Sequence, residues 1–89
     1  MPNISRPRAN PAIVLREEFY NWAILFDPDS GDTFGLNAVG VLIWKCLDGR
    51  HAIEDILKKM NQTFENVSAD AKSHIEELIK ALIQKGLAE

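Results

Sequence analysis

The 89-residue sequence contains a single cysteine, Cys46, which excludes an internal disulfide and a zinc site built from several cysteines. It has no stretch of about 18 apolar residues, the length that a membrane-spanning helix requires. Its N-terminus is polar and interrupted by prolines, without the apolar segment of a secretion signal. These absences lead us to expect a soluble, cytoplasmic protein.

Basic charge is also scarce, because 10 lysines and arginines stand against 13 acidic residues and give a net charge of -3. A protein that binds mainly nucleic acid or an anionic membrane usually carries the opposite sign. Hydrophobic residues make up 46% of the chain, which is ordinary for a folded protein. We therefore expect one globular domain with a continuous core and no nucleic-acid or membrane partner.

Residues that commonly carry out catalysis or bind metals are too sparse to form a site. His51 and His74 are far apart, and neither has a second ligand at helical spacing. Cys46 falls in an apolar helical segment and is expected to be a buried, inert thiol. The acidic turn at residues 27–32 lacks the glycine and glutamate positions of a calcium loop. The sequence thus predicts a non-enzyme that binds no cofactor or metal.

Proline content divides the chain into a tail, residues 1–11, and a domain, residues 12–89. Three of the four prolines fall in the tail, which we expect to be flexible. Residues 13–15, 20–26 and 33–36 are rich in β-forming residues and predict three short strands. Residues 27–32 are dense in turn formers, so the strands should form an antiparallel meander.

After Leu36 the apolar spacing changes from a period of two to that of a helix. Asn37 is a suitable N-cap for a first helix that extends to about residue 47. A second helix is predicted from about Ile53, and a third from Ser68 as N-cap to Lys85, closed by Gly86. The fold class is therefore α+β, with three helices covering one face of a three-stranded antiparallel sheet.

Several segments together resemble the PqqD family, named for a protein of pyrroloquinoline quinone (PQQ) synthesis. The likeness extends over about residues 13–87, and its most specific part combines Leu-Asn-x-x-Gly with Ile-Trp-x-x-Leu-Asp-Gly. The segments that carry it are residues 25–32, 34–40, 43–49, 53–56 and 78–87. The chain departs from the family at Ala52, where a threonine often caps the second helix, and at His74, where an aspartate is common.

The resemblance implies a winged helix-turn-helix-like domain that acts as a RiPP recognition element, a binder of the leader segment of a ribosomally made precursor peptide. It implies a partner that modifies the peptide, often a radical S-adenosylmethionine (radical SAM) enzyme. The iron–sulfur cofactors would belong to that enzyme, so this chain is expected to act as a peptide-binding adaptor or chaperone.

A physical argument from the predicted topology leads to the same kind of partner. The third strand lies at a sheet edge, where an extended peptide can add by main-chain hydrogen bonds. Apolar side chains between this strand and the third helix would supply further affinity, although each of them also suits the core. The expected peptide-binding residues are Thr33, Phe34, Gly35, Leu36, Lys72, Ile75, Leu78, Ile79 and Leu82.

Two other functions remain open from the sequence. A winged-helix DNA-binding protein has the same elements, although Glu76 and Glu77 in the third helix and the net negative charge disfavour it. A structural subunit or homodimer is the second alternative, because two copies could pair through the exposed strand.

Overall fold

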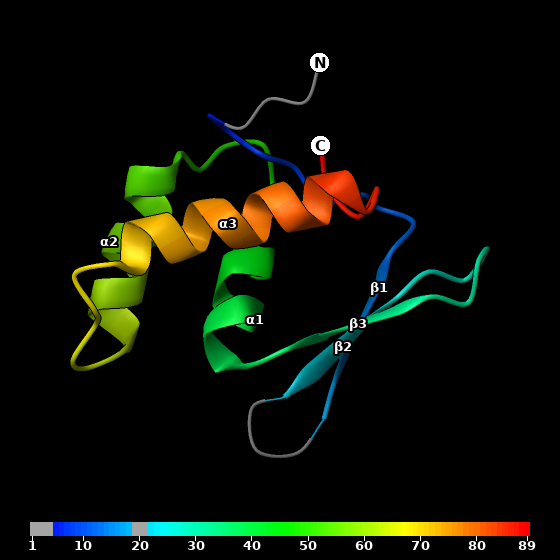
Figure 1. Cartoon of the computed structure of the whole chain (residues 1–89), viewed down its shortest axis with the longest axis horizontal. Helices are drawn as coiled ribbons and strands as arrows, with labels where there is room; N and C mark the ends of the chain where they lie inside the picture. The colour runs from blue at the N-terminus through cyan, green and yellow to red at the C-terminus, as the bar shows by residue number, and fades with distance from the viewer. Residues whose placement is uncertain (1–4, 19–21) are drawn as a thin grey trace.

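A computed structural model describes residues 5–18 and 22–89 and confirms the predicted order of three strands followed by three helices (Figure 1). Residues 20 and 21 of the predicted second strand lie outside the described residues. The elements are β1 (Val14–Glu17), β2 (Ala23–Phe26), β3 (Thr33–Leu36), α1 (Ala38–Lys45), α2 (Ile53–Thr63) and α3 (Ala71–Gln84).

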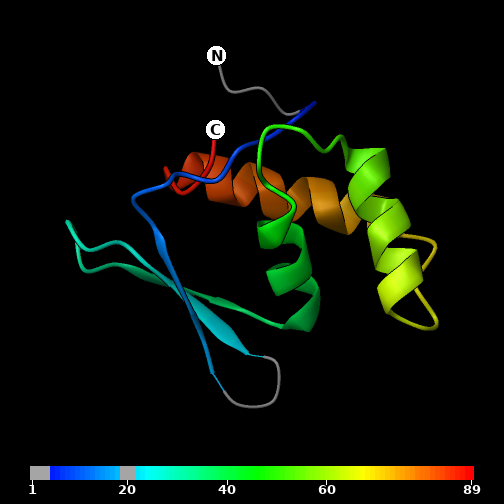
Figure 2. The ribbon, with the colours of Figure 1, turned by 180° about the vertical axis from the view of Figure 1, so that it is seen from behind.

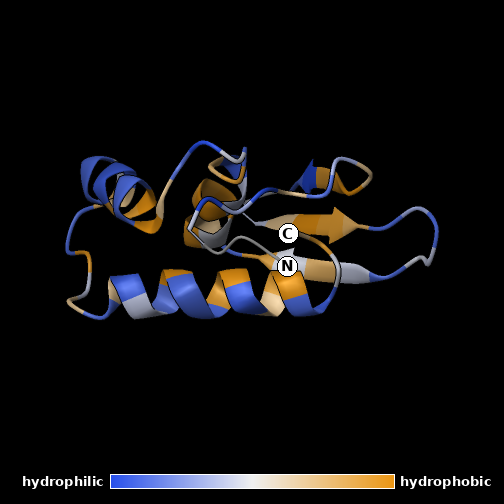
Figure 3. Ribbon diagram, turned by 90° about the horizontal axis from the view of Figure 1, so that it is seen from above, coloured by the Kyte–Doolittle hydropathy of each residue, from blue (hydrophilic) through white to orange (hydrophobic). Residues whose placement is uncertain are grey.

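The sheet is antiparallel, with the order β1-β2-β3. Side chains alternate between its faces, so that Ala23 and Leu25 of β2 are buried while Ile24 and Phe26 point to the other side. The strands are mostly apolar and the turn between β2 and β3 is polar, as Figure 3 shows. The sheet therefore contributes its buried face to the core and leaves an outer face without a covering helix.

The β2–β3 turn forms because its polar side chains and its glycine satisfy the local backbone. The N–H of Asp27 donates to the carbonyl of Asp32 at 2.9 Å, and the N–H of Gly31 donates to the carbonyl of Asp27 at 2.8 Å. Gly31 has φ +80°, a conformation that glycine adopts without steric cost. The Asp27 carboxylate also accepts the N–H of Asp29. This hairpin projects away from the helices (Figure 1).

The Leu-Asn-x-x-Gly segment joins β3 tightly to α1. The side-chain oxygen of Asn37 accepts the N–H of Gly40 at 2.9 Å, which confirms Asn37 as the N-cap. A Cβ atom at position 40 would lie 3.0 Å from Leu36 Cδ2 and 3.3 Å from Leu36 Cβ, so a larger residue there would require Leu36 to shift. The segment thus fixes the direction in which α1 leaves the sheet.

The starts of α2 and α3 differ in how they are capped. Ala52 has no side chain to cap α2, and only Asp55 contributes, by accepting the N–H of Ala52 at 2.9 Å. The predicted N-cap of α3, Ser68, is wrong, because the helix begins at Ala71 with Asp70 at the N-cap. The Ser68 hydroxyl instead accepts the N–H of Asp70 at 3.1 Å, in a turn that precedes the helix.

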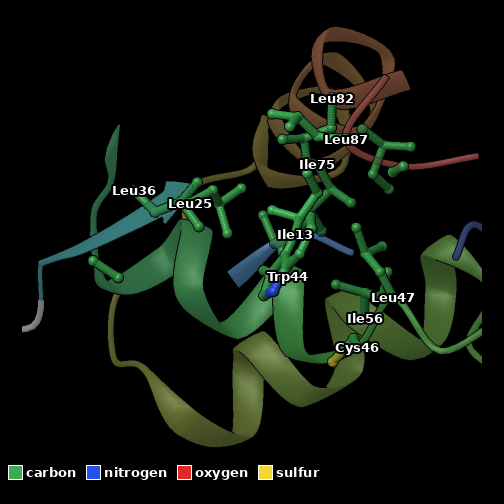
Figure 4. Packing of buried hydrophobic residues seen from close by; sticks show 14 of the residues in the cluster. Ile13, Leu25, Leu36, Trp44, Cys46, Leu47, Ile56, Ile75, Leu82 and Leu87 are labelled. Carbon is green, nitrogen blue, oxygen red and sulfur yellow. The ribbon is translucent and has the colours of Figure 1, made fainter. Parts of the chain in front are cut away.

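One core joins the sheet to all three helices (Figure 4). Leu25 and Leu36 enter it from the sheet, Ile43 from α1, Ile56 from α2 and Ile79 from α3, each almost inaccessible to solvent. Among the described residues, no helix is both long and apolar enough to cross a membrane.

The segment at residues 7–10, predicted as part of a flexible tail, is held by the fold. Arg8 and Glu89 exchange backbone hydrogen bonds of 2.7 and 2.8 Å, and the N–H of Ala9 donates to the carbonyl of Leu47 at 2.8 Å. Pro7 is fully buried and accepts the N–H of Gly49. The segment passes between the C-terminus and the α1–α2 connection (Figure 2).

Removal of residues 1–10 is therefore expected to lower the free energy of unfolding by about 3 kcal/mol or more, since six backbone hydrogen bonds of about 0.5–1.5 kcal/mol each are lost. Urea denaturation followed by circular dichroism measures the change. An Arg6→Ala variant, which keeps the backbone contacts, serves as the control and should stay within about 0.5 kcal/mol of the wild type. Equal stability of the truncated and full chains would mean that the segment is a free tail.

Replacement of Ala52 by serine should stabilise the protein by about 1 kcal/mol, because Ala52 already has the extended backbone of an N-cap residue but offers no side-chain acceptor. The same urea titration measures it. Ala69→Ser, at an exposed site outside the N-cap position of a helix, is the matched control and should change little. A gain no larger than that of the control would contradict the capping argument.

Candidate functional site

The free edge of β3 is the first feature of the site. Because Asp27 and Asp32 form a hydrogen-bonded pair, the alternation of an antiparallel ladder directs the N–H and C=O groups of Phe34 and Leu36 toward β2. The same groups of Thr33 and Gly35 point away from the sheet. No backbone group of the described residues outside the sheet hydrogen-bonds to Thr33 or Gly35. Two donors and two acceptors therefore line an open edge.

The opposite edge of the sheet, β1, is protected by charge. There the hydrogen bond from Glu18 N–H to the Trp22 carbonyl places the N–H and C=O of Glu17 on the free side. An ion pair of 2.8 Å joins Glu17 to Lys45 of α1, and a second of 3.1 Å joins Arg16 to Glu18. Charged side chains of this kind discourage strand pairing. By contrast, β3 presents Thr33 and Gly35, so it is the edge that can accept a strand.

Two of the predicted apolar residues remain within reach of solvent beside this edge. Phe34 of β3 and Leu78 of α3 are both half-buried and pack against the core. The ammonium group of Lys85 lies 5.9 Å from the centroid of the Phe34 ring, which shows that the C-terminal end of α3 approaches β3. Phe34 and Leu78 are thus the apolar residues among the predicted contacts whose side chains remain partly accessible.

The other predicted apolar residues lie in the core. Ile75, Ile79 and Leu82 are completely inaccessible, and Leu36 is nearly so. The structure thus assigns these four residues to the core, one of the two roles that the sequence left open. Their direct contact with a peptide stays a prediction, and it would require these buried side chains to become accessible. They support α3 from beneath and hold its accessible side in place.

Lys72, one of the expected peptide-binding residues, is paired with another helix. Its ammonium group lies 3.0 Å from the carboxylate of Glu54 in α2. This hydrogen bond raises the pKa of Lys72 and lowers that of Glu54. Both side chains are exposed, so the pair contributes little to stability. Lys85 is not among the site residues that the sequence predicts. The structure places Lys85 next to β3 through its contact with the Phe34 ring.

A cleft beside α1 is the main concave feature among the described residues. The cleft, of about 730 Å³, is bounded by α1, the C-terminal part of α2 and the end of β1, with Trp22, Cys46 and His51 among its lining residues. Burial raises the pKa of the Cys46 thiol, which favours its protonated form. His51 Nδ1 lies 2.9 Å from Asp48 Oδ1. This hydrogen bond is the main reason that the pKa of Asp48 is lowered, and the hydrogen bond that the Arg50 N–H donates to the Asp48 carboxylate is the second.

Residues 23–88 match the family model of Coenzyme PQQ synthesis protein D (PqqD). The chain belongs to the PqqD family. This confirms the resemblance found in the sequence, and the match includes β2, β3 and all three helices. The open edge and α3 therefore both lie within the PqqD region, whereas β1 and the segment before it lie outside.

Two solved structures share the fold. TbiB1 in complex with the TbiA(beta) leader peptide has a TM-score of 0.75 and 24% identity, covering 92% of this chain and 94% of that one. A lasso peptide synthetase B1 complexed with a leader peptide has a TM-score of 0.76 and 27% identity, covering 94% and 98%. No curated protein is similar enough to the chain to count as a match.

Alanine substitutions at neighbouring positions of α3 separate packing from surface contact. Ile79→Ala should lower the free energy of unfolding by about 2–5 kcal/mol, since it opens a cavity in the core. Leu78→Ala should cost less, about 1–2 kcal/mol, because that side chain is half-buried. Chemical denaturation of both variants measures the difference. Equal losses would contradict the proposed division between core and accessible residues.

Proposed function

We propose that this protein is a non-catalytic adaptor that binds the leader of a ribosomally made precursor peptide as an additional strand along β3. The adaptor would then present the peptide to an enzyme that modifies it, in the cytoplasm. The observation that carries the proposal is the open edge at Thr33 and Gly35, whose four backbone groups face away from β2.

The energetics explain why the edge needs help from side chains. Each backbone hydrogen bond to the peptide contributes only about 0.5–1.5 kcal/mol, so a few such bonds give weak affinity. Apolar peptide side chains on the α3 side of the strand would add about 25 cal/mol for each Å² that they bury. Phe34 and Leu78 are the accessible residues there, and Lys85 offers a positive charge beside them.

The relatives support a peptide ligand. The two solved structures described above each contain a leader peptide, and each matches more than nine-tenths of this chain. Membership of the PqqD family agrees with a role in the synthesis of a peptide-derived product, as PQQ is. These likenesses favour a leader peptide over nucleic acid as the ligand of this domain.

The chemistry would belong to a partner. Cys46, the single cysteine of the chain, is buried, and burial raises the pKa of its thiol, which favours the less nucleophilic protonated form. The resemblance to the PqqD family implies a radical SAM enzyme as the partner, with the cofactors bound by that enzyme. We extend this expectation to the present chain as part of the proposal.

The Gly35→Pro variant tests strand addition. Proline removes an N–H that points away from the sheet, so the variant should fold, yet it should bind a leader peptide about tenfold more weakly because a hydrogen bond is lost and the ring obstructs the edge. Glu17→Pro removes the equivalent outward N–H on β1 and is the matched control. Fluorescence anisotropy with labelled candidate leader peptides measures both affinities.

Amide spectra of the isotopically labelled protein verify that each variant is folded and show where the peptide binds. We expect the shifts on peptide addition to concentrate at Thr33–Leu36 and along α3. Unchanged affinity in a folded Gly35→Pro variant, or a loss confined to Glu17→Pro, would rule against β3 as the binding edge. Light scattering at several concentrations identifies the alternative of a homodimer formed through that edge.

A further inference from the structure

The outer face of the sheet is unusually apolar. Three large hydrophobic side chains are exposed within the described part of the chain, and all three lie on or beside this face: Val14 at 50%, Trp22 at 57% and Phe26 at 39%. In an antiparallel sheet with one face on the core, the other face normally carries polar residues. Ile24, which is only partly buried, continues the apolar surface between Trp22 and Phe26.

Trp22 extends this surface to the open edge. Its Cζ3 atom lies 4.0 Å from the point that a Cβ of Gly35 would occupy, and that point faces outward because Gly35 pairs with Ile24. Positive φ angles occur at Gly31, Gly49 and Gly86 but not at Gly35, so the backbone there does not require a glycine. A glycine inside a strand weakens it and often marks close approach by another chain. Because Gly35 has no side chain, nothing from that residue separates the indole of Trp22 from the open edge of β3.

We infer that the bound leader places an apolar side chain on the outer face, opposite Gly35, where it packs against the indole of Trp22. This inference rests on the proposed strand addition at β3. Residues of the leader opposite Phe34 or Leu36 would face α3, and the residue opposite Gly35 would face the other way. The leader therefore contacts side chains on both faces of the sheet, on the α3 side and at Trp22.

The two contacts define a class of peptide. Anchors on opposite faces of a strand occur at adjacent positions, or at another odd separation, whereas anchors in a single groove alternate. The ligand is thus an extended segment with two neighbouring apolar residues, one for the α3 side and one for Trp22. Trp22 is the residue that determines specificity on the outer face.

The size of the surface favours such a peptide over a second copy of the chain. Val14, Trp22 and Phe26 expose on the order of 300 Å² together, given the usual areas of such side chains. A stable protein interface buries about 800 Å² on each partner. The patch is continuous with the edge that the peptide would occupy, and one or two peptide side chains would cover its Trp22 end.

A random library of 12-residue peptides, displayed on their own messenger RNA and selected on the full chain, provides the probe. Affinities of the recovered peptides are then measured for the wild type and for Gly35→Pro, Trp22→Ser and Val14→Ser. Trp22→Ser should weaken binding about tenfold, as the loss of a central aromatic contact commonly does. Val14→Ser removes an equally exposed apolar residue from the far strand, β1, and should have little effect.

The decisive measurement couples the two sides of the contact. Serine at the outward apolar position of the peptide should cost about tenfold on the wild type and almost nothing on Trp22→Ser, since the two changes remove the same contact. Gly35→Val inserts a side chain between the indole and the edge, so it should also reduce this coupling. It provides an independent test if the Trp22→Ser variant proves unstable. Thermal unfolding verifies the fold of each protein.

The remaining results separate the two proposals. Peptides that require the unmodified Gly35 edge but tolerate Trp22→Ser would overturn the outer anchor and leave strand addition intact. Peptides that bind Gly35→Pro as tightly as the wild type would overturn strand addition itself. A concentration-dependent dimer that Trp22→Ser abolishes would assign the outer face to self-association and overturn the inference.

Discussion

The hydrogen-bonded pair of Asp27 and Asp32 sets the register on which the rest of the structure depends. From that pair onward, alternate residues of β3 bond to β2 or face outward, which leaves Thr33 and Gly35 at the open edge. The same alternation turns Leu36 into the core, directly before the cap that begins α1. A shift of one residue would exchange both the bonded groups and the faces of every side chain. The turn therefore determines the accessible backbone and the position of the helices together.

Much of the fold could be predicted because it depends on local chemistry. Asn37 caps α1 as its position before an apolar helical pattern indicates, and Gly86 ends the last helix with φ +77°. Ser68 misled the prediction because serine also forms short turns just before a helix, and a sequence does not distinguish the two uses. The faces of β2 were ambiguous for another reason: both carry apolar residues, so alternation shows two faces without indicating the buried one.

The site was harder to predict than the fold, because accessibility arises from packing between distant elements. The edge strand followed from the short connections of the meander. In α3, however, Ile79 is buried and its neighbour Leu78 is half-buried, a difference that depends on the rotation of the helix against the sheet. The docking of residues 7–10 leaves no mark in the sequence at all, since it consists largely of backbone hydrogen bonds that almost any residues can form.

The mutual bonds of Arg8 and Glu89 have an architectural consequence. They hold the first and last parts of the described fold side by side, at the top of the view in Figure 1 near the C-terminal end of α3. Polypeptide joined at either terminus would depart from that shared corner, so a larger protein could incorporate this module at its front or its back with the strand-accepting border still facing outward.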